Sequence, residues 1–560
     1  MKKLAFFLFV SLLFCVITVG CSSENCNFAL GSLFPIDPPE PPVPPTPRVV
    51  DIQGVVLNPA LDAPNGRPVP GVEVGYYDAD GDFQRLGYTN SDGEFIVTVN
   101  CSPVGKVDLN FRKLGYGEDK GYGYTFDTLH LTFDSESHPI YSDKPILAYL
   151  NICSDLSIDS KTILEFDSGS LVGDLLQGSY AAFSLSPDEE YMYVADSDNV
   201  ATNPTKKIAR IKMETLYSSA PKVEYIVGKL PNGTTHSYNQ PRGIVFSKDG
   251  DTMYIGEWNG SKILKFTGLK SAPVDTLSGG ELVYNCFILA GTGQTGGLST
   301  DGKGVLARFN RIAQIVLADD GNIKDDILYV ADSYDHTIRK ITGVSTAIDG
   351  TTADVTTIAG AHLNSTSGTQ VDGPALPTAR FNQPYALVLS KDQKTLYIGE
   401  GEGSRLRKLT NLDTPSNSEV VSLAGTVRNS GVDPLKYGDT PIKGNTAVFF
   451  AVFAIALSAD EDVMFISDCG LPYGATDPPG HDTKNCKIKK VTGLKSALTS
   501  DDTLVSVFAG TGDYAFTDGE DGDIEIGFAG GLLLDSKNTV MYFFERYNKN
   551  LRSIQPAESP

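Results

Sequence analysis

The chain has 560 residues, of which 41% are hydrophobic and 21% charged, and it contains 56 Gly and 32 Pro. This composition is typical of a globular protein with frequent turns, and it excludes a chain that is disordered throughout. The formal net charge of −23 argues against nucleic-acid binding, because proteins that bind nucleic acids neutralise phosphates with Lys and Arg.

Residues 1–20 have the three-part pattern of an export signal, with Lys2 and Lys3, an apolar run and the small residue Gly20. The stretch Ile17–Cys21 resembles a bacterial lipoprotein box, in which the cysteine receives diacylglycerol and becomes the mature N-terminus. This resemblance implies lipidation at Cys21 and a place at the bacterial cell envelope, in the outer membrane, facing the periplasm or the cell surface. An ordinary signal peptide or a single N-terminal membrane helix remains the alternative.

Residues 21–48 are expected to tether the lipid to the folded domains. The stretch Pro35–Pro47 is predicted to be a polyproline spacer, which extends by about 3.1 Å per residue and holds the following domains away from the membrane. The lipid is therefore the only contact with the membrane that the sequence predicts.

Residues 49–152 are predicted to form a small β-sandwich, because short alternating segments are separated by Gly, Pro, Asn and Asp. The clearest strands lie at 72–77 and 94–99. The segments Ile52–Val56, Pro68–Val74 and Thr89–Phe95 resemble the carboxypeptidase regulatory-like domain, a transthyretin-like sandwich. The resemblance implies a structural module and no catalytic residue.

Residues 153–556 repeat one unit, and residues 557–560 are a short tail. Each unit has a first strand, a turn, a second strand that ends in an acid, and a third strand with basic residues; most units add a fourth strand that ends in Ala-Gly. The first strands begin at Tyr180, Pro241, Ile312, Pro384, Val452 and Phe528. The acids are Asp196, Glu257, Asp332, Glu400, Asp468 and Glu545. Six units of about four strands each predict a six-bladed β-propeller, in which neighbouring blades cover one another's faces.

The units resemble the NHL repeat, which reads approximately as Pro-x-Gly-Ile-Ala-Val, a turn, Tyr-Val-Ala-Asp, a polar triplet and Ile-x-Lys. Tyr329–Asp332 and Ile338–Ile341 match this pattern closely, as do Gln240–Val245 and Phe381–Pro384. The resemblance implies an all-β chain, in which a small β-sandwich precedes a six-bladed propeller of the NHL or TolB-like kind. The first, fifth and sixth units are degenerate.

The last unit ends after its third strand, at Ile554. Closure of the ring is therefore predicted to recruit a strand from before the first unit, and Lys161–Phe166 is the best candidate. Such a strand would tie the two ends of the domain together.

The repeated acids are interpreted as structural, because catalysis needs one positioned group and not six equivalents. Each acid is expected to accept hydrogen bonds from the backbone at the corner between the second and third strands. The basic residues of the third strands are expected to form a solvated face or to pair with these acids, at about 0–1 kcal/mol for each exposed pair. His336, which is unmatched in the other units, stays a candidate functional residue.

Some NHL-like propellers are enzymes: lactonases coordinate calcium near the central pore, and the peptidyl-hydroxyglycine lyase uses a histidine-bound zinc. Zinc catalysis needs about three protein ligands, and the histidines of this chain offer no recurring inward position. No metal ligand is therefore assigned. A calcium-dependent lactonase-like or lyase-like enzyme remains the alternative function, with calcium as the one cofactor to consider.

The fifth unit inserts a proline-rich loop between Cys469 and Cys486. The flanking strands are antiparallel neighbours, so these cysteines are predicted to form a disulfide that contributes about 3 kcal/mol through chain entropy. Loops on rigid frameworks often carry function, which makes Tyr473 a candidate ligand-binding residue. The sequence leaves open the pairing of Cys26, Cys101, Cys153 and Cys286.

Aromatic residues follow three of the repeated acids, at Trp258, Tyr334 and Tyr547, and Trp258 is the only tryptophan. Aromatics beside carboxylates can form a shallow platform for a sugar or a peptide. Packing between blades is the alternative interpretation. We expect a binding scaffold whose partner is an envelope protein or a glycan and not a nucleic acid, and no catalytic residue is assigned.

Overall fold

The computed structural model describes most of the chain after residue 180 and the strands before it. The described ranges are 181–196, 208–218, 221–277, 280–319, 326–362, 370–426, 435–469, 486–512, 517–519, 523–536, 540–545 and 550–556, with strands at intervals between 4 and 165. Cys21, the stretch Pro35–Pro47, Tyr473 and Tyr547 lie outside the described residues. The chain divides into two compact units, one from Met1–Leu156 and the other from Ser157–Ser536 and Val540–Pro560.

The first unit consists of strands. They are β1 (Leu4–Ala5), β2 (Thr18–Gly20), β3 (Arg48–Val55), β4 (Leu57–Asn58), β5 (Arg67–Pro68), β6 (Glu73–Tyr77), β7 (Phe83–Tyr88), β8 (Glu94–Cys101), β9 (Lys106–Arg112), β10 (Tyr124–Phe126), β11 (Leu129–Phe133), β12 (Pro139–Tyr141) and β13 (Ala148–Leu150). The strands expected at 72–77 and 94–99 correspond to β6 and β8.

Two larger sheets organise this unit, with the strand orders β1-β2-β3-β8 and β12-β11-β9-β6-β7. Phe95 and Val97, two positions apart on β8, are both buried, as is Val74 on β6. That spacing is the period of a strand with one buried face. No helix in the described part of the chain is long and apolar enough to cross a bilayer.

The second unit is also built from strands, and they follow one another in short antiparallel runs. They are β14 (Ile158–Glu165), β15 (Ala181–Leu185), β16 (Tyr191–Asp196), β17 (Ile208–Lys212), β18 (Val223–Lys229), β19 (Pro241–Phe246), β20 (Thr252–Glu257), β21 (Lys262–Thr267), β22 (Asp275–Thr276), β23 (Leu282–Ala290), β24 (Gly302–Lys303), β25 (Ile312–Ala318), β26 (Ile327–Asp332), β27 (Thr337–Thr342), β28 (Asp354–Gly360), β29 (Gly373–Pro374), β30 (Pro384–Leu389), β31 (Leu396–Glu400), β32 (Arg405–Thr410), β33 (Glu419–Ala424), β34 (Ile442–Lys443), β35 (Val452–Leu457), β36 (Val463–Asp468), β37 (Lys487–Thr492), β38 (Leu504–Ala509), β39 (Ala529–Leu534), β40 (Met541–Glu545) and β41 (Asn550–Pro556).

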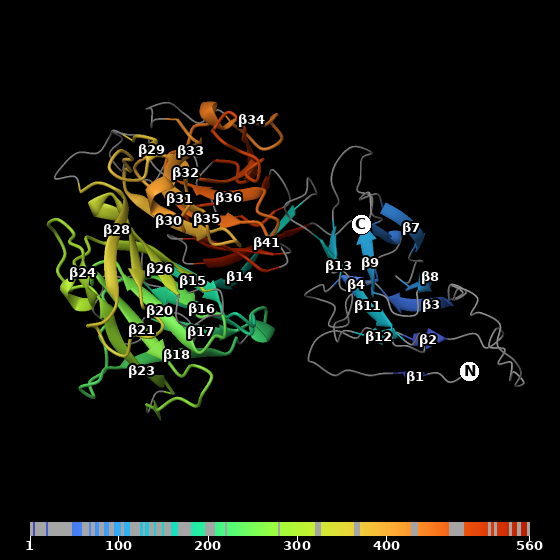
Figure 1. Ribbon diagram of the computed structural model, residues 1–560, viewed down its shortest axis with the longest axis horizontal. Coiled ribbons are helices and arrows are strands. Elements are labelled where there is room, and N and C mark those ends of the chain that lie inside the picture. Colours follow the sequence, from blue (N-terminus) through green and yellow to red (C-terminus); the bar gives the residue numbers. More distant parts are fainter. Residues whose placement is uncertain are drawn as a thin grey trace, which may run out of the picture. The chain divides into compact units, whose positions relative to one another are not determined.

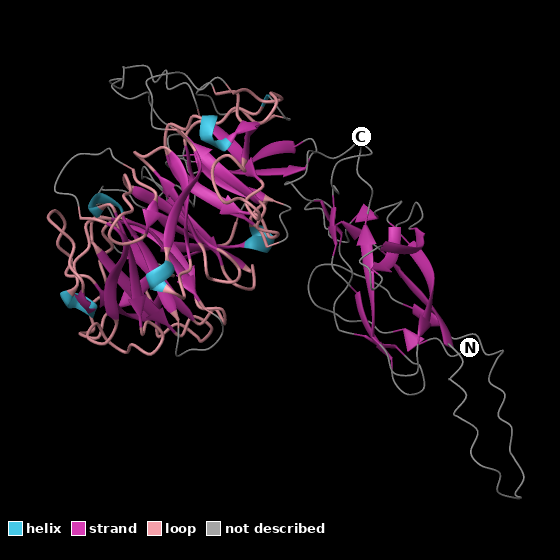
Figure 2. Cartoon of the chain, turned by 45° about the horizontal axis from the view of Figure 1, so that its top comes forward, coloured by secondary structure: helices cyan, strands magenta, loops and turns pink. Residues whose placement is uncertain are grey.

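Helices within the described ranges are single 3-10 turns between these strands (Figure 2). They are η1 (Met213–Thr215), η2 (Gly304–Leu306), η3 (Ser333–Asp335), η4 (Pro415–Asn417) and η5 (Gly444–Thr446).

The sheets of the second unit are propeller-like blades, but they differ from the six separate four-stranded sheets predicted from the sequence. Four sheets each correspond to one repeat: β14-β41-β40-β39, β24-β28-β27-β26-β25, β29-β33-β32-β31-β30 and β34-β38-β37-β36-β35. The first two repeats share one nine-stranded sheet, because β18 pairs in parallel with β23. Three blades gain a fifth strand, because the short strands β24, β29 and β34 pair with β28, β33 and β38.

The first strands of successive repeats lie side by side around a common axis. β15 contacts β19, and the same contact continues through β25, β30, β35 and β39 back to β15. The C-terminal sheet is completed by β14, which pairs antiparallel with β41 from Ile158 opposite Pro556 to Glu165 opposite Asn550 (Figure 1). The strand predicted at Lys161–Phe166 to complete the last unit is thus confirmed.

A β-bulge recurs near the start of the first strand in five repeats. The residues passed over in the pairing are Gly243, Ala313, Tyr385, Phe453 and Gly530. A bulge bends the strand and changes the direction of a side chain. Gly243 has φ +59°, and an added Cβ would lie 2.8 Å from the backbone nitrogen of Ile315, so the first of these bulges favours glycine.

Candidate functional site

The first strands of the repeats enclose an axial cavity. Its lining residues come from all six of these strands, and they include Arg242, Ala313, Tyr385, Phe453 and Gly530 at or beside the bulges. The void, together with the solvent open to it, is about 600 Å³. The bulged positions therefore determine which side chains line this cavity. We call the part of the cavity lined by Arg242, Ala313, Tyr385, Phe453 and Gly530 the channel mouth.

Arg242 lines the cavity, and its guanidinium packs on Trp258. The guanidinium carbon lies 3.9 Å from the centroid of the Trp258 ring. The same guanidinium donates a hydrogen bond to the hydroxyl of Tyr385, whose ring centroid is 5.5 Å from that of Trp258. Arg242, Trp258 and Tyr385 are only 6%, 7% and 9% exposed. Stacking on an indole is a favourable environment for a guanidinium that has lost much of its water.

A second cation, Arg311, lies at the outer edge of this group. Its guanidinium carbon is 4.2 Å from the ring centroid of Tyr334 and 5.5 Å from that of Trp258. The rings of Trp258 and Tyr334 meet edge to face at 5.4 Å and 88°. Tyr334 follows β26, and its backbone N–H donates to the carbonyl of Asn310 before β25. The segment before β25 therefore positions Arg311, and the turn after β26 positions Tyr334.

The aromatic contacts continue from Tyr385 into the fifth and sixth repeats. The ring centroids of Tyr385 and Phe453 are 5.2 Å apart, and those of Phe453 and Phe528 are 5.0 Å apart. Tyr385 and Phe453 occupy the same bulged position of successive repeats. Comparing the second residue of each first strand in the sequence would have revealed Arg242, Tyr385 and Phe453, which the sequence analysis did not single out.

The four aromatic residues predicted to bind a ligand do not form one described surface. Tyr334 is 40% exposed, but Trp258 is 7% exposed and one of its faces is covered by Arg242. Tyr473 and Tyr547 lie outside the described residues. A ligand can therefore stack on Tyr334, whereas Trp258 mainly packs against Arg242 and Arg311.

The repeated acids are buried at the corners between second and third strands. Asp332, Glu400, Asp468 and Glu545 are all 0% exposed, Glu257 is 1% exposed and Asp196 is 4% exposed. They accept backbone N–H groups from the segment that leads into the first strand, for example from Asn310 to Asp332 at 2.7 Å and from Phe450 to Asp468 at 2.7 Å. These contacts are the ones that a structural role requires.

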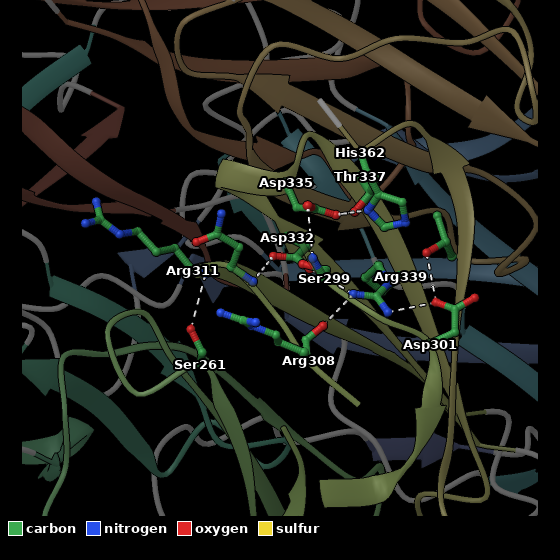
Figure 3. Close-up of polar contacts among 12 residues, drawn as sticks. Ser261, Ser299, Asp301, Arg308, Arg311, Asp332, Asp335, Thr337, Arg339 and His362 are labelled. Carbon is green, nitrogen blue, oxygen red and sulfur yellow. Dashed lines mark hydrogen bonds and ion pairs between the residues drawn. The ribbon is translucent and has the colours of Figure 1, made fainter. Parts of the chain in front are cut away.

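Cations of the third strands pair with these acids inside the protein, so the expected solvated face does not apply to them. The buried pairs are Asp332–Arg339 at 2.9 Å, Glu400–Arg407 at 2.9 Å, Asp468–Lys489 at 2.7 Å and Glu545–Arg552 at 2.8 Å. Arg339 also pairs with Asp301 at 2.8 Å, which joins the corner to the outer strand (Figure 3). In the second repeat His236 takes the place of the cation, 2.8 Å from Glu257.

Burial shifts the pKa values of three of these acids. It raises the pKa of Asp332 to about 6, against the opposing effect of Arg339. It also raises the pKa values of Glu400 and Glu545, in which Arg407 and Arg552 act in the opposite direction. Desolvation of a carboxylate therefore outweighs the nearby charge at three corners.

Cys469 and Cys486 lie together at the base of the inserted loop. Both are buried free thiols, and they share an apolar cluster with Phe528 and the half-buried Phe453. Burial and the neighbouring Cys469 thiol raise the pKa of Cys486 well above its ordinary value. The structure thus brings the two sulfurs together as thiols, and their disulfide remains a prediction.

His336 makes a contact between repeats. It is 8% exposed, its Nδ1 accepts the backbone N–H of Gln383 at 3.1 Å, and burial lowers its pKa. His362 pairs with Asp335 on the same corner (Figure 3). Within the described ranges, no group of three or more His, Cys, Asp or Glu side chains could hold a metal ion, so no residue is assigned to calcium or zinc.

Comparisons with known proteins give limited information. No family model matches the chain. NHL repeat-containing protein 2 of Bos taurus is 26% identical over 184 residues, which is 32% of this chain and 22% of that protein. The chain therefore matches less than a quarter of the length of this curated relative. The NHL-like repeats inferred from the sequence nevertheless have a counterpart in a protein with NHL repeats.

Several solved structures that resemble this chain come from Bacteroides species. A structural genomics protein of unknown function from Bacteroides thetaiotaomicron is 14% identical, covers 91% of this chain and 94% of that chain, and has a TM-score of 0.46. An auxiliary nutrient binding protein from the same species is 11% identical, with coverages of 91% and 94% and a TM-score of 0.44. At TM-scores below 0.5, the fold has to be argued from the strand pairing described above.

Proposed function

We propose that this chain is a binding scaffold of the bacterial cell envelope, which holds a glycan or a protein at the channel mouth of an NHL-like propeller with six blades. The observation that carries the proposal is the stacking of Arg242, which lines the axial cavity, on Trp258, with the guanidinium carbon of Arg311 5.5 Å from the centroid of the same ring. Ligand sites typically combine a recess with a few convergent polar groups.

The six-blade count is supported by the repeats and by the closed circle of contacts among β15, β19, β25, β30, β35 and β39. The shared nine-stranded sheet then counts as two blades joined by the β18–β23 pair. In this arrangement the repeated acids hold the corners, and the residues that differ between repeats line the channel mouth. Function is thus assigned to the variable positions of a repeated framework.

The N-terminal part supplies the attachment in this proposal. Lipidation at Cys21 and the spacer Pro35–Pro47 would hold the folded parts near the membrane, and the carboxypeptidase regulatory-like sandwich would act as a structural module. The alternative of a calcium-dependent lactonase or lyase has no observation in its favour among the described residues, and we derive no reaction step for it.

The binding proposal is tested with Tyr334→Ala and Arg311→Gln in a glycan array and in pull-downs from envelope extract. Tyr334 is 40% exposed, and the guanidinium carbon of Arg311 lies 4.2 Å from its ring centroid, so we expect each variant to lose ligands that the parent protein retains. Lys303→Gln, on β24 in an exposed pair with Asp354, is the control. Unchanged binding by both mouth variants would contradict the proposal. Loss of lipid label in Cys21→Ser tests the anchor separately.

A further inference from the structure

The corner of the second repeat differs from its counterparts in the charge partner of its acid. The acids of the third to sixth repeats pair with an arginine or a lysine of the third strand. In the second repeat Leu264 takes the strand position of Arg339. Glu257 instead meets His236 from the segment before β19, with Nε2 2.8 Å from Oε1 and side chains that are 7% and 1% exposed. The backbone N–H of this histidine donates to the carbonyl of Gly228 at 2.8 Å, which fixes its position.

The corner of the second repeat is otherwise built like the corner of the fourth. An added Cβ on Gly260 would meet the carboxylate of Glu257, and one on Gly403 would meet the carboxylate of Glu400. Both acids end a second strand, and both accept a backbone N–H from the segment that leads into the first strand. The two corners therefore differ mainly in the group that supplies the positive charge.

The same corner positions Trp258. The carboxylate of Glu257 accepts the backbone N–H of Asn239 at 2.9 Å. The carbonyl of Gln240 accepts the N–H of Trp258 at 2.8 Å, and the carbonyl of Asn239 accepts the N–H of Gly260 at 3.1 Å. The turn 257–260 and the segment 239–240 are thus tied together through Glu257. A change in what this carboxylate binds is transmitted directly to the turn that carries the tryptophan.

We propose that the His236–Glu257 pair is a pH-sensitive switch, which holds the turn of Trp258 firmly when His236 is charged and loosens it when His236 is neutral. This inference concerns the conformation of the turn and goes beyond the proposed function. A carboxylate can only accept, so Nε2 carries a proton in both states, and a second proton on Nδ1 makes the ring a cation. A hydrogen bond between ions is stronger than a neutral one, and a buried carboxylate without a charge partner is destabilised. Histidine changes its charge between about pH 5 and 8, whereas arginine and lysine do not.

The titratable neighbours of this pair do not change charge in the same range. The ring centroid of Tyr238 lies 5.2 Å from that of His236, and burial raises the pKa of Tyr238 well above its ordinary value. Burial and the charge of Glu257 raise the pKa of Cys286 on β23 to about 12. Lys262 lies opposite Glu257 in the pairing of β20 with β21, and lysine keeps its charge up to about pH 10. A transition between about pH 5 and 8 at this corner therefore belongs to the His236–Glu257 pair.

The test follows the fluorescence of Trp258 in the full chain. It is the only tryptophan, so the quenching of its emission by acrylamide reports directly on the turn. We expect the quenching constant to rise at least about twofold between about pH 5 and 8, as His236 loses its charge. His236→Gln, which keeps a hydrogen-bond donor but no charge, should remove this transition. His362→Gln is the control, because this histidine is 37% exposed and pairs with Asp335 of another repeat, and the transition should persist there.

Glu257→Gln gives a second measurement, because a carboxamide at this corner needs no charge partner and should also remove the transition. Each variant is compared after its circular dichroism has been matched to that of the parent protein, and the parent curve and the control decide the matter where a variant does not fold. A parent protein whose quenching does not change with pH would overturn the inference. So would a transition that persists in His236→Gln or disappears in His362→Gln. No ligand is used, so these outcomes are independent of the glycan array and the pull-downs that test the proposed function.

Discussion

Asp332 and Arg339 form an ion pair in which both side chains are 0% exposed, with Nη1 and Oδ2 2.9 Å apart. The pair joins the end of β26 to β27, and Arg339 reaches on to Asp301 next to the outer strand β24. Its counterparts in the fourth, fifth and sixth repeats have the same geometry. The stretch from Tyr329 to Gly343, which holds two aspartates, a histidine and two basic residues, is thus the internal frame of a blade.

Removing the cation of this pair should destabilise the protein strongly. Arg339→Met leaves a carboxylate buried without its charge partner, and such losses typically cost about 3–5 kcal/mol of unfolding free energy. The exposed pair Lys303–Asp354 supplies the control, because Lys303→Met removes a cation that is 61% exposed and should change stability little. Urea denaturation of both variants measures the difference. Equal costs would show that burial of the Asp332–Arg339 pair is not important for stability.

The raised pKa of Asp332 predicts a pH dependence with a defined sign. Its folded-state pKa of about 6 lies above the ordinary value of 3.8 for an aspartate, so the folded state binds the proton more tightly. The contribution to stability is fully present below about pH 4 and is lost as pH rises through 6.

The measurement compares the parent protein with Asp332→Asn in urea at pH 4, 5 and 6. The variant lacks this titration, so its unfolding free energy should fall less steeply with pH, by up to about 1.4 kcal/mol per pH unit, the value for one proton. The comparison between the two proteins is required because Asp301 and other acids have lowered pKa values and act with the opposite sign. Parallel curves for the two proteins would contradict the assigned pKa shift.

The repeat pattern of the sequence was sufficient to predict the inner strands, the corner acids and the closing strand. Each follows from local periodicity and from the number of strands that a closed ring needs. The sequence did not predict that the cations of the third strands are buried, because Arg339 and Lys340 are adjacent on one strand and only the sheet shows which one points inward. It also missed the fifth strands, which pair with the fourth strand of the same blade and are too short, at two residues each, to show a strand pattern of their own.

The channel mouth could be predicted only in part for a related reason. Trp258 and Tyr334 were found because they follow the repeated acids, but their exposure differs as a result of packing by Arg242 from another strand. The positions of Arg242, Tyr385 and Phe453 depend on β-bulges. A bulge cannot be recognised from the alternation of apolar and polar residues along a strand. Alignment of the repeats would have marked these positions as variable ones in a conserved frame.

The closing strand β14 predicts a sharp dependence on where the propeller begins. A chain that starts at residue 157 keeps β14 and its seven pairs with β41, whereas a chain that starts at residue 166 loses them. The shorter chain leaves backbone groups on one edge of β41 unpaired, so it should have a clearly lower melting temperature or aggregate. Thermal unfolding followed by circular dichroism compares the two. Similar melting temperatures would mean that β14 is not needed for closure.

The thiols of Cys469 and Cys486 predict a redox effect. Because they share one buried cluster at the base of a long loop, oxidation during folding should join them and stabilise the protein by about 3 kcal/mol. Peptide mapping without reductant should find this disulfide, and reduction should lower the melting temperature. The effect should vanish in the Cys469→Ala/Cys486→Ala double variant and persist in Cys286→Ala, since Cys286 is buried apart from them and burial raises its pKa to about 12. Retention of both free thiols in exported protein would overturn the prediction.

Trp258 and Tyr334 should separate stability from binding. Trp258 is 7% exposed and lies against Arg242, Tyr334 and Tyr385, so Trp258→Ala should cost about 3–5 kcal/mol of unfolding free energy. Tyr334 is 40% exposed, and Tyr334→Ala should cost about 1 kcal/mol or less while it weakens ligand binding. Urea denaturation and calorimetric titration on the same samples distinguish the two effects. A Tyr334→Ala protein that unfolds early and binds normally would reverse the roles assigned to these two rings.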